Sequence, residues 1–427
     1  MLRRLAEEKT GCVSIVEECL AAIDAREKDI RAWVVVDRDE ARRQAANLDT
    51  ELSVGHRRGP LHGIPVGVKD IIDVIGLPSV AGYRPWRHRI AGTDAELVRR
   101  LRLAGAVILG KTETTQFASY DPSPTRNPHN LDRTPGGSSS GSAAAVAAGM
   151  CLVAVGTQTG GSINRPAAFC GVCGFKPSYG AVPLDGVVPV AKSLDHAGPI
   201  AGSISDIAYL ADVLIDNTDG CFMSNAAAGI SQPPRLARLP DLFDVHADRE
   251  SIAALDRSAE IFERAGASVI DTPLPPILAG IVAAHGLIMD YEAATYHRQR
   301  FKEDPAEFQP NITRQINRGL TTSGTDYAAA LQVMAEAKHT AAELFANCDA
   351  WLAPATVGEA PGLETTGNPV MNSPASFLHL PAINLPVSVS KNGLPLGIQL
   401  LGNKNADGEL IAIASWAEQQ LNDADRS

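Results

Sequence analysis

The 427-residue sequence lacks the features that mark several large classes of protein. It has no excess of positive charge: 38 Lys and Arg residues against 49 Asp and Glu residues give a formal net charge of −11, which argues against a broad nucleic-acid-binding surface. Residues 1–20 mix charged and apolar side chains without an apolar core of about 7–15 residues, so they do not resemble a signal peptide. The seven cysteines are scattered and odd in number, which favours reduced thiols in a cytoplasmic protein.

A second absence is local: no side chain between Thr134 and Asn164 is charged. This run is long enough to span a bilayer, but its Gly, Ser, Thr and Gln content is too polar for a transmembrane helix. The stretch 134–171 holds five serines and eight glycines, which is typical of a linker, yet an Ala/Val core segment is embedded in it. If one of these serines is a nucleophile, its base must lie outside the segment, because 134–171 contains no His, Asp or Glu.

Apolar periodicity indicates strands alternating with helices through about residue 215, which predicts an α/β layered fold. Strand-like segments return at 350–355, 381–390 and 396–402, and a helix follows them. Because the two ends look like parts of one sheet, we expect a single domain over residues 1–427. The segment at about 232–345 is rich in helix formers, and we interpret it as a helical insert or cover.

Two motifs match known patterns by accident. GAVILGKT (105–112) has the letters of a phosphate-binding loop, but a helix precedes its first glycine and its middle residues read as a strand, which cannot curl around an anion. Cys170 and Cys173 have the spacing of a zinc or redox pair, but no second ligand pair lies nearby. We interpret them as two small buried thiols.

Two side chains are candidate bases for a serine nucleophile. His196 could serve, with Asp195 or Asp185 orienting its ring, although a turn histidine with a structural role is commoner. Lys69 lies in IPVGVKDII (64–72), the most apolar setting of any lysine in the chain. Burial there lowers a lysine pKa from about 10.4 towards the range where a neutral amine accepts a proton. Asp70 need not neutralise it, because neighbouring side chains on a strand point to opposite faces.

Taken together, these residues resemble the amidase signature family. The resemblance rests on GIPVGVKD (63–70), GGSSSG (136–141) and GTQTGGSINRPAAFCG (156–171), and further motifs agree in order: PTRNP (124–128), GFKPSYG (174–180), SLDHAGP (193–199) and LPAINLPVS (380–388). It covers most of residues 1–215 and 348–420. It implies a large mixed β-sheet core covered by helices on both sides.

The resemblance also implies a catalytic set. Lys69 corresponds to the base, Ser138 to the proton relay and Ser162 to the nucleophile, with a cis peptide before the relay serine at Gly137 and a supporting role for Ser139. Glycine-rich backbone after the relay would let N–H groups surround an oxyanion. The residues in that position are Thr159, Gly160, Gly161 and Ser162.

The sequence departs from the family pattern next to the nucleophile. Many members have an acidic residue where this chain has Gln158 and an arginine where it has Asn164, and the arginine is displaced by one, to Arg165. We interpret the change as a buried ion pair replaced by a neutral amide pair. Together with PTRNP it favours, weakly, small urea-like substrates such as biuret or allophanate.

The sequence therefore predicts a hydrolase that cleaves the C–N bond of a small amide or urea-like substrate through an acyl-enzyme on Ser162. The resemblance implies no metal and no organic cofactor. The expected partner is a small-molecule amide, and neither a nucleic acid nor a membrane is expected. The sequence is compatible with a homodimer. Two alternatives stay open. One is a glutaminase-type A subunit of a tRNA-dependent amidotransferase complex, and the other is a catalytically silent binding protein on the same scaffold.

Overall fold

The structure of the protein is a computed structural model that describes residues 11–216 and 222–424. One 11-stranded sheet runs through the described residues in the order β1-β3-β2-β4-β6-β5-β10-β11-β9-β7-β8. The strands are β1 (Trp33–Val36), β2 (Pro65–Lys69), β3 (Val107–Thr112), β4 (Val153–Gln158), β5 (Cys173–Lys176), β6 (His196–Ala201), β7 (Arg235–Arg238), β8 (Ser268–Asp271), β9 (Ala350–Pro354), β10 (Ala382–Val389) and β11 (Pro395–Leu401).

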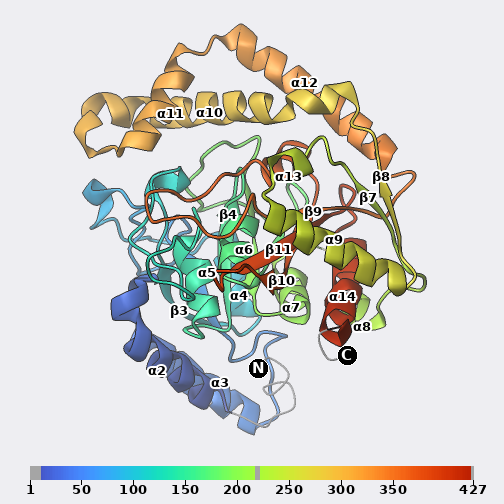
Figure 1. Cartoon of the computed structure of the whole chain (residues 1–427). Coiled ribbons are helices and arrows are strands. Elements are labelled where there is room, and N and C mark those ends of the chain that lie inside the picture. The colour runs from blue at the N-terminus through green and yellow to red at the C-terminus, as the bar shows by residue number, and fades with distance from the viewer. Residues whose placement is uncertain (1–10, 217–221, 425–427) are drawn as a thin grey trace.

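The helices of the described residues lie around this sheet, some packed on its strands and others packed on neighbouring helices. They are α2 (Cys12–Ile30), α3 (Arg38–Ser53), α4 (Glu96–Leu103), α5 (Ser140–Ala147), α6 (Asn164–Phe169), α7 (Ile204–Leu214), α8 (Phe222–Ala228), α9 (Arg249–Arg264), α10 (Ile281–Glu303), α11 (Pro310–Thr321), α12 (Gly324–Leu344), α13 (Ser373–Phe377) and α14 (Asp407–Ala424). Figure 1 shows α10, α11 and α12 as a layer at the top of the molecule, with α2 and α3 at the lower left.

Strand pairing confirms the expected mixed α/β fold. β2 pairs in parallel with both β3 and β4, and β7 pairs in parallel with β8 and β9, while the remaining pairs are antiparallel. Val68 of β2 lies opposite Val155 of β4. The carboxyl ends of these two parallel strands therefore lie side by side, which brings Lys69 next to the residues that follow Val155.

The glycine-rich stretch is not a linker, because it is buried and lets backbone segments approach closely. Gly136 has φ +83°, and a Cβ atom there would lie 2.8 Å from the Cα atom of Pro166. Only glycine fits both the left-handed conformation and the contact without strain. The loop before α5 can thus pack directly on the start of α6.

The segment 232–345 is less uniformly helical than expected. It contains α9 to α12, but it also contributes β7 and β8, which form one edge of the sheet beside β9. Each of these strands has only four residues, and β8 is largely exposed. Such short edge strands carry little apolar periodicity, which is why the sequence pattern did not reveal them.

One described helical segment, Pro276–Glu303, is long and apolar enough to cross a membrane by length and composition alone. It contains α10, which packs against α11 and α12. Its polar side chains bond to the rest of the protein: His285 Nε2 lies 2.8 Å from Thr159 O, and Glu292 Oε2 accepts a hydrogen bond from Ser193 N at 3.0 Å. Two of its polar side chains thus join the helix to the segments that contain Thr159 and Ser193.

The segment that imitates a phosphate-binding loop forms the strand β3, as its apolar residues predict. Lys111 points into the protein, where its Nζ donates to Asp70 Oδ1 at 2.9 Å, to Pro78 O at 2.8 Å and to Ser79 Oγ at 3.1 Å. Both charged side chains of this ion pair are buried. Lys111 thus has a structural role, and it binds the carboxylate that lies next to Lys69 in sequence.

Lys111→Met should lower the free energy of unfolding by about 3–5 kcal/mol, because it leaves the buried Asp70 carboxylate without its cation. Chemical denaturation followed by circular dichroism measures the change. Arg43→Met is the matched control, since Arg43 pairs with Glu40 at the surface, and its loss should change stability by less than about 1 kcal/mol. Equal effects of the two substitutions would contradict the structural role.

Candidate active site

Lys69 ends β2 with its side chain fully buried. Its Nζ atom lies 2.8 Å from Ser138 Oγ and 2.7 Å from Thr157 Oγ1, and no carboxylate is within ion-pair distance of it among the described residues. The lysine and the candidate relay serine are 69 positions apart in sequence. The parallel pairing of β2 and β4 brings Lys69 to Thr157, and the hydrogen bonds between Ser139 and Thr157 hold the loop of Ser138 against the same strand.

The surroundings of Lys69 disfavour its charged form. Burial lowers the pKa of Lys69 well below its ordinary value, the negative charge of Asp195 opposes this shift, and the positive charge of Arg165 adds to it. Asp70 points away and binds Lys111 instead, as expected for neighbouring side chains on a strand. A neutral amine can accept a proton, so Lys69 has the environment that a general base needs.

Ser138 follows Gly137 across a cis peptide bond. The next residue, Ser139, ties this loop to two other segments: its hydroxyl bonds to the backbone O and N of Thr157, at 3.2 Å each, and its backbone N donates to Ser162 O at 3.3 Å. Ser139 therefore has a structural role that holds the loop of Ser138 against the segment of Ser162.

The four residues of the segment 159–162 have an unusual pattern of backbone hydrogen bonds. Every carbonyl accepts a bond from elsewhere in the protein, in chain order from His285 Nε2 (2.8 Å), Ser376 Oγ (3.2 Å), Arg165 N (2.9 Å) and Ser139 N (3.3 Å). By contrast, the N–H groups of residues 160–162 donate to no other residue in the described ranges. Anchored carbonyls beside free N–H groups make a cradle for a negatively charged oxygen.

The side chain of Thr159 is fixed by a buried carboxylate. Its Oγ1 donates to Asp195 Oδ1 at 2.5 Å, and this carboxylate also accepts from the backbone N–H groups of Val190 and Ala191. Burial raises the pKa of Asp195 to about 6, against the effect of these bonds. Asp195 thus positions the segment that precedes Ser162.

His196 does not form a pair with a serine. Its Nδ1 lies 2.7 Å from Leu194 O and 3.3 Å from Gln158 O, and burial lowers its pKa well below the ordinary value. No hydrogen bond in the described part of the chain joins it to Ser138 or Ser162. Of the two candidate bases, only Lys69 lies against a serine of the glycine-rich stretch.

Our interpretation of Gln158 and Asn164 as an amide pair is wrong. Gln158 Oε1 accepts from the backbone N–H groups of Ile163 and Asn164, at 2.8 and 3.0 Å, and so covers the start of α6. The side-chain amide of Asn164 is buried and has no partner among the described residues. A glutamine therefore satisfies backbone donors at a helix start, where free N–H groups need an acceptor.

Two groups at the site were not predicted from the sequence. Thr157 provides the second hydroxyl group that contacts Lys69 Nζ. The sequence held a signal for it, because Thr157 and Thr159 are two residues apart on an extended segment and such residues point to the same face. His285 had no such signal. It lies on α10, more than 120 residues away, and only the packing of that helix brings it to Thr159.

The structure offers little support for a metal or redox role of the cysteines. The Sγ atom of Cys170 lies 3.5 Å from Pro135 O, Cys173 lies 3.9 Å from Glu418, and burial raises the pKa of both thiols. No group of three or more potential metal ligands occurs within residues 11–216 and 222–424. The residues described thus agree with the interpretation of two buried thiols.

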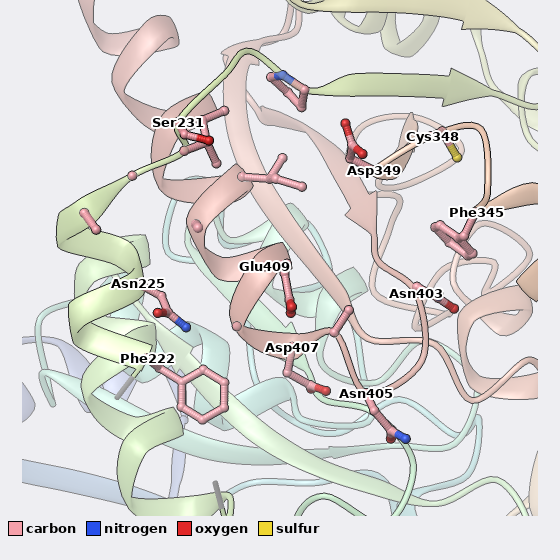
Figure 2. Close-up of a pocket in the computed structure, with 18 of the residues that line it drawn as sticks. Phe222, Asn225, Ser231, Phe345, Cys348, Asp349, Asn403, Asn405, Asp407 and Glu409 are labelled. Carbon is pink, nitrogen blue, oxygen red and sulfur yellow. The ribbon is translucent and has the colours of Figure 1, made fainter. Parts of the chain in front are cut away.

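A separate cavity of about 1150 Å³ lies between α8, α14 and the loops around Ser231 and Asp349, as Figure 2 shows. Its most buried acid, Asp407, already accepts hydrogen bonds from Ser178 N at 2.8 Å and Ser178 Oγ at 2.5 Å. None of the predicted catalytic residues lines this cavity. It is distinct from the site around Lys69.

The family model described as "Amidase" matches residues 14–411. The chain belongs to the amidase family. The resemblance to amidase signature enzymes seen in the sequence is thereby confirmed, and the coarse activity class of this family is amide-bond chemistry.

Two curated relatives are glutamyl-tRNA(Gln) amidotransferase subunits A. The protein from Koribacter versatilis is 32% identical, over 98% of this chain and 96% of its own length. The protein from Anaeromyxobacter sp. is 35% identical, over 98% of this chain and 94% of its own length. This amidase therefore matches those subunits almost from end to end.

Solved structures with the same fold include several described as amidases. A chain of a vestigial protein complex that is described as revealing the evolutionary origins of an s-triazine catabolic enzyme is 29% identical, with a TM-score of 0.91 over 99% of this chain and 97% of its own. A structure described as an amidase is 33% identical, with a TM-score of 0.89 over 98% of both chains. The peptide amidase from Stenotrophomonas maltophilia is 28% identical, with a TM-score of 0.82 over 98% of this chain and 96% of its own.

Thr157→Val keeps the shape of the side chain but removes the hydroxyl group that contacts Lys69 Nζ. We expect a fluorophosphonate to label Ser162 at least about 10-fold more slowly in this variant, because the amine loses one of its two orienting partners. Mass spectrometry of the labelled peptide gives the rate. Ser142→Ala is the control, since its hydroxyl bonds to Thr112 and not to Lys69. Unchanged labelling in Thr157→Val would show that this hydroxyl does not contribute to the reactivity of Ser162.

Proposed function

We propose that this amidase hydrolyses the C–N bond of a small amide or urea-like substrate through an acyl-enzyme on Ser162, with Ser138 as relay and Lys69 as base. The observation that carries the proposal is the fully buried Lys69 amine, 2.8 Å from Ser138 Oγ, without a carboxylate partner among the described residues. Burial favours the neutral amine, and a neutral amine beside a hydroxyl group is the arrangement that removes a proton from serine.

The proposed reaction begins as Ser162 Oγ bonds to the carbonyl carbon of the substrate. Ser138 takes the proton of Ser162 and passes its own to Lys69, and the relay then runs backwards to protonate the nitrogen as the C–N bond breaks. The amine leaves, and an ester joins the acyl group to Ser162. A water molecule attacks this ester by the same relay, which releases the acid and restores the serine.

The free N–H groups of residues 160–162 suit the oxyanion that forms in both steps. One such donor contributes roughly 3–4 kcal/mol to the stability of a transition state. The four carbonyls of the segment are anchored by His285, Ser376 and neighbouring backbone, so the donors need no rearrangement when the charge develops. Preorganised donors in a site with few charges are more effective than donors in water.

A small substrate agrees with the burial of the site. Only 8% of Ser162 is exposed, and Ser138 is almost completely buried. Gly160 faces Pro369, His285 and Ser373 at van der Waals distance from a Cβ position. Helix α10 and the loop before α13 thus lie against the two residues that precede Gly161 and Ser162, and a large acyl group would have to fit beside them.

The second candidate is the A subunit of a tRNA-dependent amidotransferase, in which the same chemistry releases ammonia from glutamine. The curated relatives support it, because their names assign this role and they match 98% of this chain. The two candidates share Lys69, Ser138 and Ser162. They differ in the acyl donor and in the need for partner subunits.

Lys69→Ala should abolish ammonia release from a panel of small amides and ureas while leaving the circular dichroism spectrum unchanged. In the wild type, activity should persist below the ordinary lysine pKa of 10.5 and should disappear as the pH falls through the lowered pKa of Lys69. Ser162→Ala should also prevent labelling by a fluorophosphonate. Activity in Lys69→Ala, or a wild-type profile that declines steadily below pH 10, would refute the relay.

The two candidates are separated by assaying the purified single chain. We expect it to hydrolyse small amides without any other protein, because the whole catalytic arrangement lies within one chain. Release of ammonia from glutamine that begins only when partner subunits from the native host are added would instead establish the amidotransferase role. A chain that reacts with neither substrate nor fluorophosphonate would be a silent binding protein.

A further inference from the structure

His379 is a buried histidine whose ring is held by two neighbours. It lies in the loop between α13 and β10, is 6% exposed, and has a left-handed backbone conformation with φ +61° that non-glycine residues rarely adopt. Its ring stacks on that of Tyr179, with 3.9 Å between the ring centres. Its Nε2 atom lies 2.8 Å from Ser193 O. Because a carbonyl oxygen only accepts, Nε2 carries the ring proton and donates it to Ser193 O.

Lys338 of α12 lies against this nitrogen and has no acceptor of its own. Its Nζ atom is 3.3 Å from His379 Nε2. Since Nε2 already donates its proton, the contact brings two hydrogen-bond donors together. Within the described residues, the lysines that pair with carboxylates are Lys111 and Lys391, and Lys338 is not among them. An ammonium group therefore faces outward here without a protein acceptor in the described part of the chain.

The charges that act on this pair are positive. Burial and the charge of Lys404 lower the pKa of Lys338 to about 8, so the amine is still mostly protonated at pH 7. Burial, followed by the charges of Lys338, Lys176 and Lys404, lowers the pKa of His379 to about 3, so its ring is neutral. The buried Lys176 donates only to Pro177 O, at 3.0 Å, among the described residues. Three lysines without carboxylate partners thus share one region of a chain whose net charge is −11.

The carboxylates of this region bind other groups. Asp407 acts on the pKa of Lys176, but it accepts hydrogen bonds from Ser178 N at 2.8 Å and Ser178 Oγ at 2.5 Å. Glu292 Oε2 accepts from Ser193 N at 3.0 Å. Neither carboxylate forms an ion pair with a lysine in residues 11–216 and 222–424. A group of cations without nearby counter-ions creates a positive local potential, which attracts anions.

This group of lysines borders the cavity of about 1150 Å³. Tyr179, whose ring stacks on His379, lines the cavity, and so do Asn403 and Asn405 on either side of the exposed Lys404. Figure 2 shows both asparagines at one side of the cavity. Their amide groups can donate and accept hydrogen bonds. The region therefore combines unpaired positive charge with room for an uncharged polar group beside it.

We propose that Lys338 and Lys404 bind a phosphate group, and that the adjoining cavity holds the rest of a phosphorylated small molecule. A phosphate offers several oxygen acceptors to ammonium donors, and lysine binds it as a point charge. It would supply the acceptor that Lys338 lacks. The proposal does not depend on the catalytic set, because no hydrogen bond in the described ranges joins either lysine to Lys69, Ser138 or Ser162.

Isothermal titration calorimetry of the full chain at fixed ionic strength measures the binding of inorganic phosphate and of ribose 5-phosphate. Lys338→Met and Lys404→Met should each raise the Kd of both ligands at least about 10-fold, because each removes one of the two ammonium groups. Lys302→Met is the matched control, since it removes an exposed lysine in the last turn of α10. Its Kd values should stay within about 2-fold of the wild type, because exposed distant charges are screened by salt.

Two further comparisons locate the ligand. Ribose 5-phosphate should bind more tightly than inorganic phosphate, and equal affinities would overturn the role given to the cavity. Wild-type protein whose Ser162 is blocked by a fluorophosphonate should keep its Kd for phosphate. Loss of phosphate binding in the blocked protein would place the anion at the catalytic site and overturn the proposal. Equal phosphate affinities of the wild type and both lysine variants would overturn it as well.

Discussion

The site depends on one arrangement: a lysine amine buried against two hydroxyl groups and kept apart from carboxylates. A lysine in water is protonated at neutral pH and cannot act as a base. Here Lys69 Nζ meets Ser138 Oγ and Thr157 Oγ1, and its complete burial disfavours the ammonium form. Both hydroxyl groups come from the charge-free stretch between Thr134 and Asn164, so a composition that resembles a linker provides uncharged partners for the lysine instead.

The amine of Lys69 can stay neutral only if the nearby carboxylates bind other groups. Asp70, the next residue in sequence, is held by Lys111 and by the backbone of residues 80–81 on the other face of the sheet. The negative charge of Asp195 does act on the pKa of Lys69. However, the carboxylate of Asp195 accepts hydrogen bonds from the hydroxyl of Thr159 and from two backbone N–H groups. The fold therefore keeps two carboxylates near Lys69 without forming an ion pair with it, and both carboxylates stabilise the loops that define the site.

The sequence predicted the parts of the site whose signals are local. Lys69 was recognisable by its apolar flanks, and the two glycine-rich loops by their composition, because a strand and a close backbone approach each require particular residues in one short stretch. His285 and the edge strand β8 carried no comparable signal, since the first reaches Thr159 only through the packing of α10 and the second is short and exposed. The sequence showed that Gln158 and Asn164 stand where many family members have charged residues. It did not show that the two amides do not pair, because pairing depends on side-chain directions that spacing does not determine.

Arg165 adds a second physical cause to the weak basicity of Lys69. Its positive charge acts together with burial to lower the pKa of Lys69. The same guanidinium donates through Nη2 to Gly137 O at 2.7 Å, just before Ser138. Because a charge lowers a neighbouring lysine pKa only while it is held close by, the contact that anchors Arg165 to the loop of Ser138 also maintains the environment of Lys69.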